Sequence, residues 1–260
     1  MTSGVRPPPA VLDAFGAIGE AVALGGGEGR CWRVADVVLK PCDDEAEWTW
    51  LSAALPTVAQ VGFRLALPVR ATDGRWVVDG WCGQPFVPGE HAERWVDVIE
   101  AGDRFHTAVA SLTRPSFLDL RTNPWSVGDR VAWEELAPPV SHPILARLLA
   151  MRGPIAAPSQ VIHGDLTENL LFADGLAPAI IDVTPYFRPR GFAAAVVVGD
   201  AVRWRDADPD PLLAAVAHDP WFPQLFVRAV IYRLVTSLVF GRTDVSYFDS
   251  DVVLAERLLG

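Results

Sequence analysis

The chain has 260 residues, of which 50% are hydrophobic and 21% charged, and its formal net charge is −10. These values exclude an intrinsically disordered chain and predict enough buried surface for one large domain or two lobes. The acidity argues against nucleic-acid binding, which needs a basic surface to release counterions, and is compatible with a cationic small molecule.

Cysteine usage and the N-terminal segment favour a cytoplasmic protein. Cys31, Cys42 and Cys82 are widely spaced and form no C-x-x-C pair, so neither a disulfide framework nor a zinc site is predicted. The proline run at residues 7–9 interrupts the apolar stretch that a signal peptide needs. The longest apolar stretch, residues 225–240, contains two arginines and is too short to span a bilayer, so no membrane association is expected.

Residues 22–40 predict a glycine-rich turn followed by two strands. Four glycines cluster near the start, and the segments CWRV and VVLK carry strand-forming residues on either side of a turn at Ala35 and Asp36. Of the 22 basic residues, 21 are arginine and one is lysine, Lys40, at the end of the second strand. A position that has kept lysine in such a chain is expected to need a compact ammonium rather than a planar guanidinium.

A helix is expected directly after the strand that carries Lys40. Asp43 or Asp44 can cap its N-terminus, and the proline at position 56 ends it. Its apolar face, at helical spacing, consists of Trp48, Leu51 and Leu55.

The pattern changes near residue 88. Strand-forming segments around residues 65–71 and 75–87 flank the turn at Asp73 and Gly74, and would complete a small antiparallel sheet. A long amphipathic helix is expected over residues 91–112, and most of the remaining sequence is expected to be helical. The sequence therefore predicts an N-terminal lobe with a small sheet over residues 1–87 and a helical C-terminal lobe over residues 88–260.

One β segment interrupts the helical half, with the sequence VIHGDLTENLLFADGLAPAIIDV. His163 and Asp165 lie in a polar turn, Asn169 precedes a short strand, and Asp182 ends the return strand. A hairpin would bring these four side chains to one end. The alternative is that the turn residues only hydrogen-bond their own backbone.

The order of these features resembles the aminoglycoside phosphotransferase and choline kinase-like family of the protein-kinase-like superfamily, including an uncharacterised bacterial branch. The resemblance covers nearly the whole chain and is strongest over residues 161–183. It implies an α+β, two-lobed protein-kinase-like fold, with a small antiparallel β-sheet and one helix in the N-lobe and a mainly helical C-lobe. It also implies an enzyme that transfers the γ-phosphate of ATP to a hydroxyl of a small molecule.

The resemblance assigns roles to individual residues. Asp165 would orient or accept the proton of the acceptor hydroxyl, and His163 would brace the loop. Asn169 and Asp182 would supply oxygen ligands to Mg²⁺. The ATP-binding set would be Lys40, Glu47, Gly25, Gly26, Gly27, Gly29, Gln84, Phe86 and Val87.

Within this set Lys40 would hold the phosphates, paired with an acidic residue of the helix that comes after it. Glu47 is preferred to Glu45 because it lies on the face of Trp48, and a solvated acidic run without a catalytic role is the alternative. The glycine turn would cover the phosphates, and the connector at residues 84–87 would contact the adenine, with Pro85 unable to donate a hydrogen bond.

Three other residues of the predicted C-terminal lobe carry less specific signals. His106 resembles a structural histidine of the family's first long helix. Arg188 and Arg190 either meet a phosphate or an anionic substrate or, more simply, lie in a surface loop. The acceptor pocket is expected around residues 133–135 and in the final eighty residues.

Two departures from the family pattern favour an alternative function. Only three residues separate Asp165 from Asn169, where relatives usually have four, and Asp182 lacks the second carboxylate that often comes after it. These differences suggest a catalytically impaired pseudokinase that binds nucleotide or a protein partner. A metal-dependent hydrolase built on His163 is disfavoured because it leaves Lys40 and the glycine turn unexplained. The acceptor, the preference for ATP or GTP and the oligomeric state are open at this point.

Overall fold

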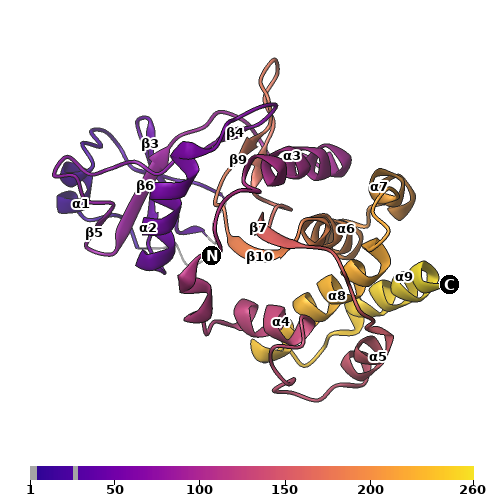
Figure 1. The fold of residues 1–260 in the computed structure, drawn as a ribbon. Helices are drawn as coiled ribbons and strands as arrows, with labels where there is room; N and C mark the ends of the chain where they lie inside the picture. The colour runs from indigo at the N-terminus through magenta and orange to yellow at the C-terminus, as the bar shows by residue number, and fades with distance from the viewer. Residues whose placement is uncertain (1–4, 26–28) are drawn as a thin grey trace. The chain divides into compact units, whose positions relative to one another are not determined.

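The computed structural model describes residues 5–25 and 29–260, which form two compact units (Figure 1). Unit 1 comprises Met1–His91 and Leu171–Asp182, and unit 2 comprises Ala92–Leu170 and Val183–Gly260. The sequence predicts a single boundary between residues 87 and 88. In the structure unit 1 instead extends to His91 and also includes the segment that ends at Asp182.

Unit 1 contains a five-stranded antiparallel sheet in the order β1-β2-β3-β6-β5. The strands are β1 (Val22–Ala23), β2 (Trp32–Val34), β3 (Val37–Pro41), β5 (Val77–Val78) and β6 (Trp81–Pro85). Two-residue turns join β2 to β3 and β5 to β6, and both use positive φ angles, at Ala35 (50°) and at Asp79 (49°) with Gly80 (76°). This backbone twist matches that of the flanking strands, so the turn predicted at Ala35 and Asp36 is confirmed.

A second small sheet in unit 1 differs from the prediction. Strand β4 (Arg64–Leu65) pairs in parallel with β9 (Ala179–Ile180), and β8 (Leu170–Leu171) is the other neighbour of β9. The prediction that residues 65–71 join the antiparallel sheet as a strand is wrong, since only Val69 bridges to Gly83 there. A two-residue strand carries too weak a local pattern to specify its partner.

In the described residues of unit 1, two helices and the 3-10 turn η2 accompany the sheets. Helix α2 (Glu45–Ala54) is capped by Asp44, whose side chain accepts a hydrogen bond from the Glu47 N–H at 3.0 Å, and the 3-10 turn η2 (Leu55–Thr57) comes next. The expected apolar face is confirmed, because Trp48, Leu51 and Leu55 are buried. A short helix that the prediction did not include, α1 (Pro9–Ala14), starts at a proline pre-organised for the first helical position and contributes Val11 to the core.

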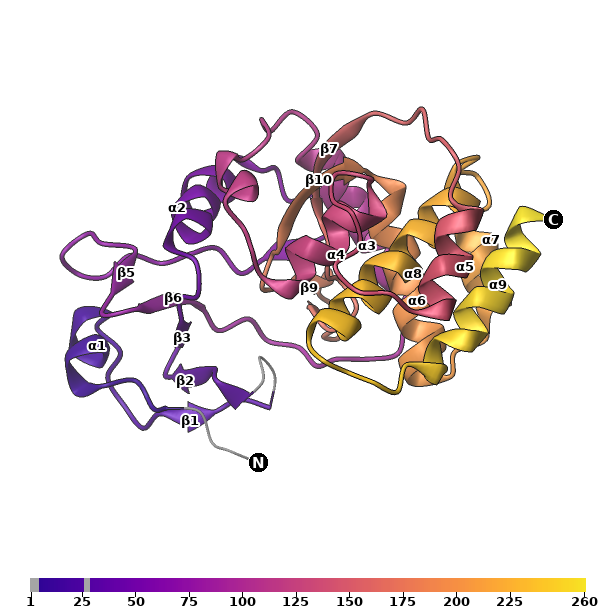
Figure 2. The same cartoon turned by 90° about the horizontal axis from the view of Figure 1, so that it is seen from below.

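Unit 2 is mainly helical, and helix α8 lies at its centre (Figures 1 and 2). Helix α8 (Phe222–Val239) packs against α4, α5, α6 and α9. It is apolar and long enough to cross a membrane, but most of it is buried within unit 2, as in the core helix of a globular protein. The other elements are α3 (Trp95–Ala108), η3 (Ser116–Asp119), α4 (Pro124–Ala132), α5 (Pro143–Met151), α6 (Gly191–Arg205), α7 (Pro209–Val216), η4 (Ser246–Phe248) and α9 (Asp249–Leu259).

A two-stranded antiparallel ribbon carries the His-Gly-Asp segment in unit 2. Strand β7 (Ser159–His163) pairs with β10 (Pro185–Pro189), so that His163 lies opposite Pro185. Helix α3 packs against both β7 and α6. The loop after His163 therefore starts from a strand fixed on one side by β10 and on the other by α3.

We expect Gly128→Ala to destabilise unit 2, although alanine is the better helix former. A Cβ at Gly128 of α4 would lie 2.5 Å from both the Thr236 hydroxyl and the Tyr232 carbonyl of α8, so the helices would have to separate. Overpacking of this kind costs about 1–3 kcal/mol. Urea unfolding should show a lower midpoint. The control is Gly199→Ala, where the nearest atom, Arg203 Nη2, is 3.3 Å away and a smaller effect is expected. Equal effects would contradict this account.

Candidate functional site

In unit 1 the chain's one lysine contacts the aspartate that ends the return strand. Lys40 Nζ donates to Asp182 Oδ1, and the Gln84 amide approaches the same oxygen at 3.4 Å. Burial would lower the pKa of Lys40, but the Asp182 carboxylate more than offsets it, so the pKa lies above its ordinary value. Asp182 also has a φ of 47°, a left-handed conformation that is uncommon for residues other than glycine and often found at functional sites.

Lys40 has a carboxylate partner that the sequence analysis did not assign to it, because Asp182 is the carboxylate that it contacts. Helix α2 reaches the lysine through Trp48, whose ring centroid is 5.2 Å from Nζ. The helical spacing therefore placed this face of α2 toward Lys40. The pairing of Lys40 with Glu47 stays a prediction.

The glycine-rich segment joins β1 to β2. The Leu24 N–H donates to the Cys31 carbonyl at 2.9 Å, which closes the hairpin. Gly25 and Gly29 have no heavy atom within 4 Å of where a Cβ would lie, and Gly29 has a φ of 72°. Gly26 and Gly27 lie outside the described residues.

In the connector after β6, one backbone N–H group has no acceptor among the described residues. The Gln84 side chain is directed at Asp182 and not at the connector, and the Phe86 N–H donates to the Asp36 carbonyl at 2.7 Å. Pro85 has no N–H. Among the described residues no acceptor takes the Val87 N–H.

In unit 2 His163 fixes the backbone around the His-Gly-Asp segment. Its Nδ1 accepts from the Asp165 N–H at 3.2 Å and from the Thr184 N–H at 3.5 Å, while the His163 N–H donates to Nε2 of His106 at 3.1 Å. Burial, followed by the neighbouring His163 and Arg190, lowers the pKa of His106 to about 3, so its ring is neutral and able to accept. His106 therefore has the structural contact that the sequence predicts.

Two glycines allow close packing around the same loop. A Cβ on Gly164 would collide with the ring of Tyr186 on β10, and a Cβ on Gly102 of α3 would lie 2.6 Å from Leu166. Leu166 is buried. The backbone of the loop thus lies closer to α3 and β10 than any larger residue at these positions would permit.

Asp165 is paired with an arginine that the sequence analysis did not single out. Arg233 Nη2 on α8 donates to Asp165 Oδ1 at 2.6 Å and to Asp200 Oδ2 on α6 at 2.5 Å. Arg233 and Asp200 each interrupt an apolar helical stretch, and a charged side chain in a buried helix indicates a buried partner. That signal could have identified both residues, but it names no partner.

The side-chain amide of Asn169 contacts the backbone of the same loop. Its Nδ2 donates to the Asp165 carbonyl at 2.6 Å, and because a carbonyl only accepts, Oδ1 must face elsewhere. No described residue donates to that oxygen. An amide oxygen, like the carboxylate oxygens of Asp182 in unit 1, is of the type that Mg²⁺ prefers. In the described part of the chain no group of three or more His, Cys, Asp or Glu residues is placed to hold a metal ion.

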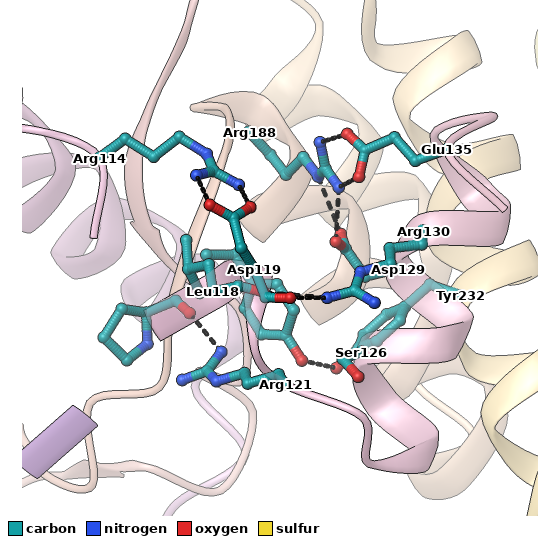
Figure 3. Close-up of polar contacts among 12 residues, drawn as sticks. Arg114, Leu118, Asp119, Arg121, Ser126, Asp129, Arg130, Glu135, Arg188 and Tyr232 are labelled. Atoms are coloured by element: carbon teal, nitrogen blue, oxygen red, sulfur yellow. Dashed lines mark hydrogen bonds and ion pairs between the residues drawn. The ribbon is translucent and has the colours of Figure 1, made fainter. Parts of the chain in front are cut away.

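A polar pocket lies within unit 2 between α4, η3 and β10 (Figure 3). At its centre Arg188 of β10 contacts two carboxylates, Asp129 at 2.6 Å and Glu135 at 2.6 Å. Arg188 is therefore neither a surface-loop residue nor unpaired, whereas Arg190 is exposed and contacts Asp103 at 3.3 Å. The charged residues that line the pocket are Arg114, Asp119, Arg121, Asp129, Arg130, Glu135 and Arg188.

A scan of protein-family models and a sequence search of curated proteins found no match. Solved structures of aminoglycoside phosphotransferases, however, are similar. The phosphotransferase of Alicyclobacillus acidocaldarius is 15% identical, with a TM-score of 0.64 over 99% of this chain and 94% of that chain. A thermostable mutant of APH(4)-Ia is 15% identical, with a TM-score of 0.57 over 95% of both chains. The spectinomycin phosphotransferase APH(9)-Ia, crystallised with ADP and spectinomycin, is 11% identical, with a TM-score of 0.57 over 96% of this chain and 92% of that chain.

These likenesses establish the fold. The chain has the mixed α+β, kinase-like fold of the aminoglycoside phosphotransferases, as the sequence predicts. Identities of 11–15% carry no information on the acceptor.

The buried neutral His106 should make stability fall in acid. The unfolded chain binds a proton at this group below its ordinary pKa of about 6.5, whereas the folded chain does so only near pH 3, so stability is lost as the pH falls between these values. The loss approaches about 1.4 kcal/mol per pH unit. We expect His106→Gln to remove this part of the slope in urea unfolding from pH 7 to 4. His218→Gln, at an exposed site, is the control, and equal slopes for wild type and His106→Gln would contradict the prediction.

Proposed function

We propose that this protein is an ATP-dependent phosphotransferase that transfers the γ-phosphoryl group to a hydroxyl of a small molecule. The observation that carries the proposal is the ion pair between Lys40 and Asp182 in a kinase-like fold, because a lysine and a metal-binding aspartate are the two groups that phosphoryl transfer needs at the nucleotide phosphates. Solved neighbours of the same fold contain ADP or GDP, which supports a nucleotide site in this chain.

The nucleotide would be held by residues of unit 1. The ammonium of Lys40 is a point charge suited to the α- and β-phosphates, and the exposed Gly25 and the turn at Gly29 leave room for a phosphate against the backbone. The Val87 N–H, which has no acceptor among the described residues, is the connector donor available to the adenine. Asp182 and Oδ1 of Asn169 would hold Mg²⁺, which when bound would neutralise charge on the phosphates.

The reaction would be carried out at Asp165 of unit 2. The acceptor oxygen forms a bond to the γ-phosphorus as the bond from that phosphorus to the β-phosphate oxygen breaks and ADP leaves with the electron pair. The hydroxyl proton passes to the Asp165 carboxylate, which orients the hydroxyl beforehand. His163 would position Asp165 through the backbone N–H that it accepts.

The acceptor is proposed to be a hydroxyl-bearing small molecule, with a cationic one compatible with the net charge of −10. Neighbouring structures hold hygromycin B or spectinomycin, so aminoglycoside-type compounds belong in any substrate panel beside amino alcohols and sugars. Glu135, in the region expected to line the acceptor pocket, does line the pocket around Arg188.

Phosphoryl transfer should depend on Asp165. With Mg²⁺-ATP and the acceptor panel, we expect a phosphorylated product from at least one acceptor, and Asp165→Asn should lower kcat by about 10²-fold or more while ATP still binds. Product detection by mass spectrometry and ATP binding by calorimetry separate the two effects. ATP binding without any product would instead favour the pseudokinase function, which the short loop before Asn169 suggested.

Nucleotide affinity should depend on the ammonium of Lys40 rather than on positive charge in general. Lys40→Arg keeps the charge but replaces a compact donor with a planar fork, so we expect the Kd for ATP to rise about tenfold. Thermal shifts with ATP, in the presence and absence of Mg²⁺, should be smaller in this variant. Arg75→Met, which removes an exposed cation of the same unit, is the control, and equal shifts for all three proteins would argue against the site.

The adenine contact can be tested by removing one backbone donor. Val87→Pro deletes the N–H and should weaken ATP about tenfold, since a lost hydrogen bond in a desolvated site costs about 1–3 kcal/mol. Val87→Ala keeps the donor and should bind ATP like the wild type. Equal Kd values for the two variants in calorimetry would place the adenine elsewhere.

A further inference from the structure

Arg233 joins two carboxylates that lie on different elements of unit 2. Its Nε donates to Asp200 Oδ1 at 3.0 Å and its Nη2 to Asp200 Oδ2 at 2.5 Å, which is a bidentate contact. The same Nη2 donates to Asp165 Oδ1 at 2.6 Å. One guanidinium therefore connects α6 to the loop after β7.

The two ends of this bridge differ in exposure. The side chains of Asp200 and Arg233 are 4% and 14% exposed, whereas that of Asp165 is 43% exposed. Asp200 is in addition held by Arg203 at 3.2 Å, and Arg203 pairs with the fully buried Asp251 at 2.7 Å. The Asp200 end is thus fixed inside the helical unit, and the carboxylate whose position depends on Arg233 is that of Asp165.

The same Asp200 also contacts the loop directly. The Thr167 hydroxyl donates to Asp200 Oδ2 at 3.1 Å, and the exposed Glu168 pairs with Arg205 of α6. Helix α6 therefore contacts the loop at Thr167 and Glu168, and Arg233 of α8 contacts it at Asp165. A loop one residue shorter than usual between Asp165 and Asn169 is in this way given a defined shape by side chains of α6 and α8.

Arg233 occupies only one oxygen of the Asp165 carboxylate. Oδ1 accepts from Arg233, while Oδ2 accepts no hydrogen bond from any residue in the described part of the chain. A carboxylate restrained at one oxygen can present the other in a fixed direction. An acceptor hydroxyl needs such a fixed partner, because in-line transfer requires its oxygen to be placed within a narrow range of positions.

We propose that Arg233 is a positioning residue that holds Asp165 Oδ1 so that Oδ2 faces the acceptor hydroxyl. This role rests on the proposed phosphotransferase function. It differs from a purely structural role, in which removing Arg233 would lower stability and activity together. It also predicts that the nucleotide, which would be bound by residues of unit 1, is unaffected by the change.

The test compares Arg233→Met with Arg228→Met. Arg228 is a buried arginine of the same helix whose hydrogen-bond partner is the neutral Gln224 side chain, at 3.5 Å, so its removal takes away a buried guanidinium without unpairing a carboxylate. We expect Arg233→Met to lower kcat about 10²-fold, because displacing the Asp165 carboxylate by about 1 Å has an effect of this size on the reaction. The Kd for ATP should stay within about twofold of the wild-type value. Arg228→Met should lower the melting temperature less than Arg233→Met, because no carboxylate loses its partner, and should change kcat less than about threefold.

Two further readouts separate positioning from stability. Free guanidinium ion, at concentrations that leave the wild type folded, should restore part of the kcat of Arg233→Ala and none of that of Asp165→Asn. In a crystal structure of Arg233→Met the Asp165 carboxylate should leave its wild-type rotamer, whereas it should keep it in Arg228→Met.

The proposal is overturned if Arg233→Met retains kcat within about threefold of wild type or leaves the Asp165 rotamer unchanged. It is equally overturned if both methionine variants lose kcat in proportion to their melting temperatures and guanidinium restores nothing. A wild-type protein that phosphorylates no acceptor would contradict the proposed function instead, and the crystallographic comparison would still decide whether Arg233 positions Asp165.

Discussion

The carboxylate of Asp200 is the group on which the arrangement of unit 2 depends most. A charge buried to this extent is stable only when cations and hydrogen-bond donors surround it, and Asp200 has Arg203, Arg233 and the Thr167 hydroxyl. Arg203 lies on α6 itself, Arg233 lies on α8, and Thr167 lies in the loop after β7. Helices α6 and α8 and the loop after β7 thus meet at one buried carboxylate, and movement of the loop would take the Thr167 hydroxyl away from Asp200 and the Asp165 carboxylate away from Arg233.

Close packing adds a second constraint on the same loop. Gly164 lies against Tyr186 and Leu166 lies against Gly102, so the backbone is enclosed by β10 on one side and α3 on the other. The neutral ring of His106 and the Nδ1 atom of His163 then accept the buried backbone donors there. Packing fixes where the loop lies, and the ion pair with Arg233 fixes where its carboxylate points.

Unit 1 has a simpler electrostatic arrangement. Lys40 and Asp182 neutralise each other in a half-buried setting, with Gln84 at hydrogen-bonding distance from the same oxygen and Trp48 beside the ammonium. The pair keeps the lysine protonated despite burial. In the proposed function a phosphate would replace the carboxylate as the partner of Lys40, and Asp182 would then be available to a metal ion, so the ion pair and the proposed role are chemically consistent.

Several features of the protein could be predicted from the sequence because their signals are local: the turn at Ala35 and Asp36, the Asp44 cap, and the strand that carries Lys40. Capping, turn geometry and side-chain periodicity act over a few residues, which a linear pattern contains. Which charged side chains form ion pairs with one another was decided by the tertiary structure alone. Asp182 is 142 positions from Lys40 and Arg233 is 68 positions from Asp165, so each pairing depends on how distant segments pack, and no local signal encodes that choice.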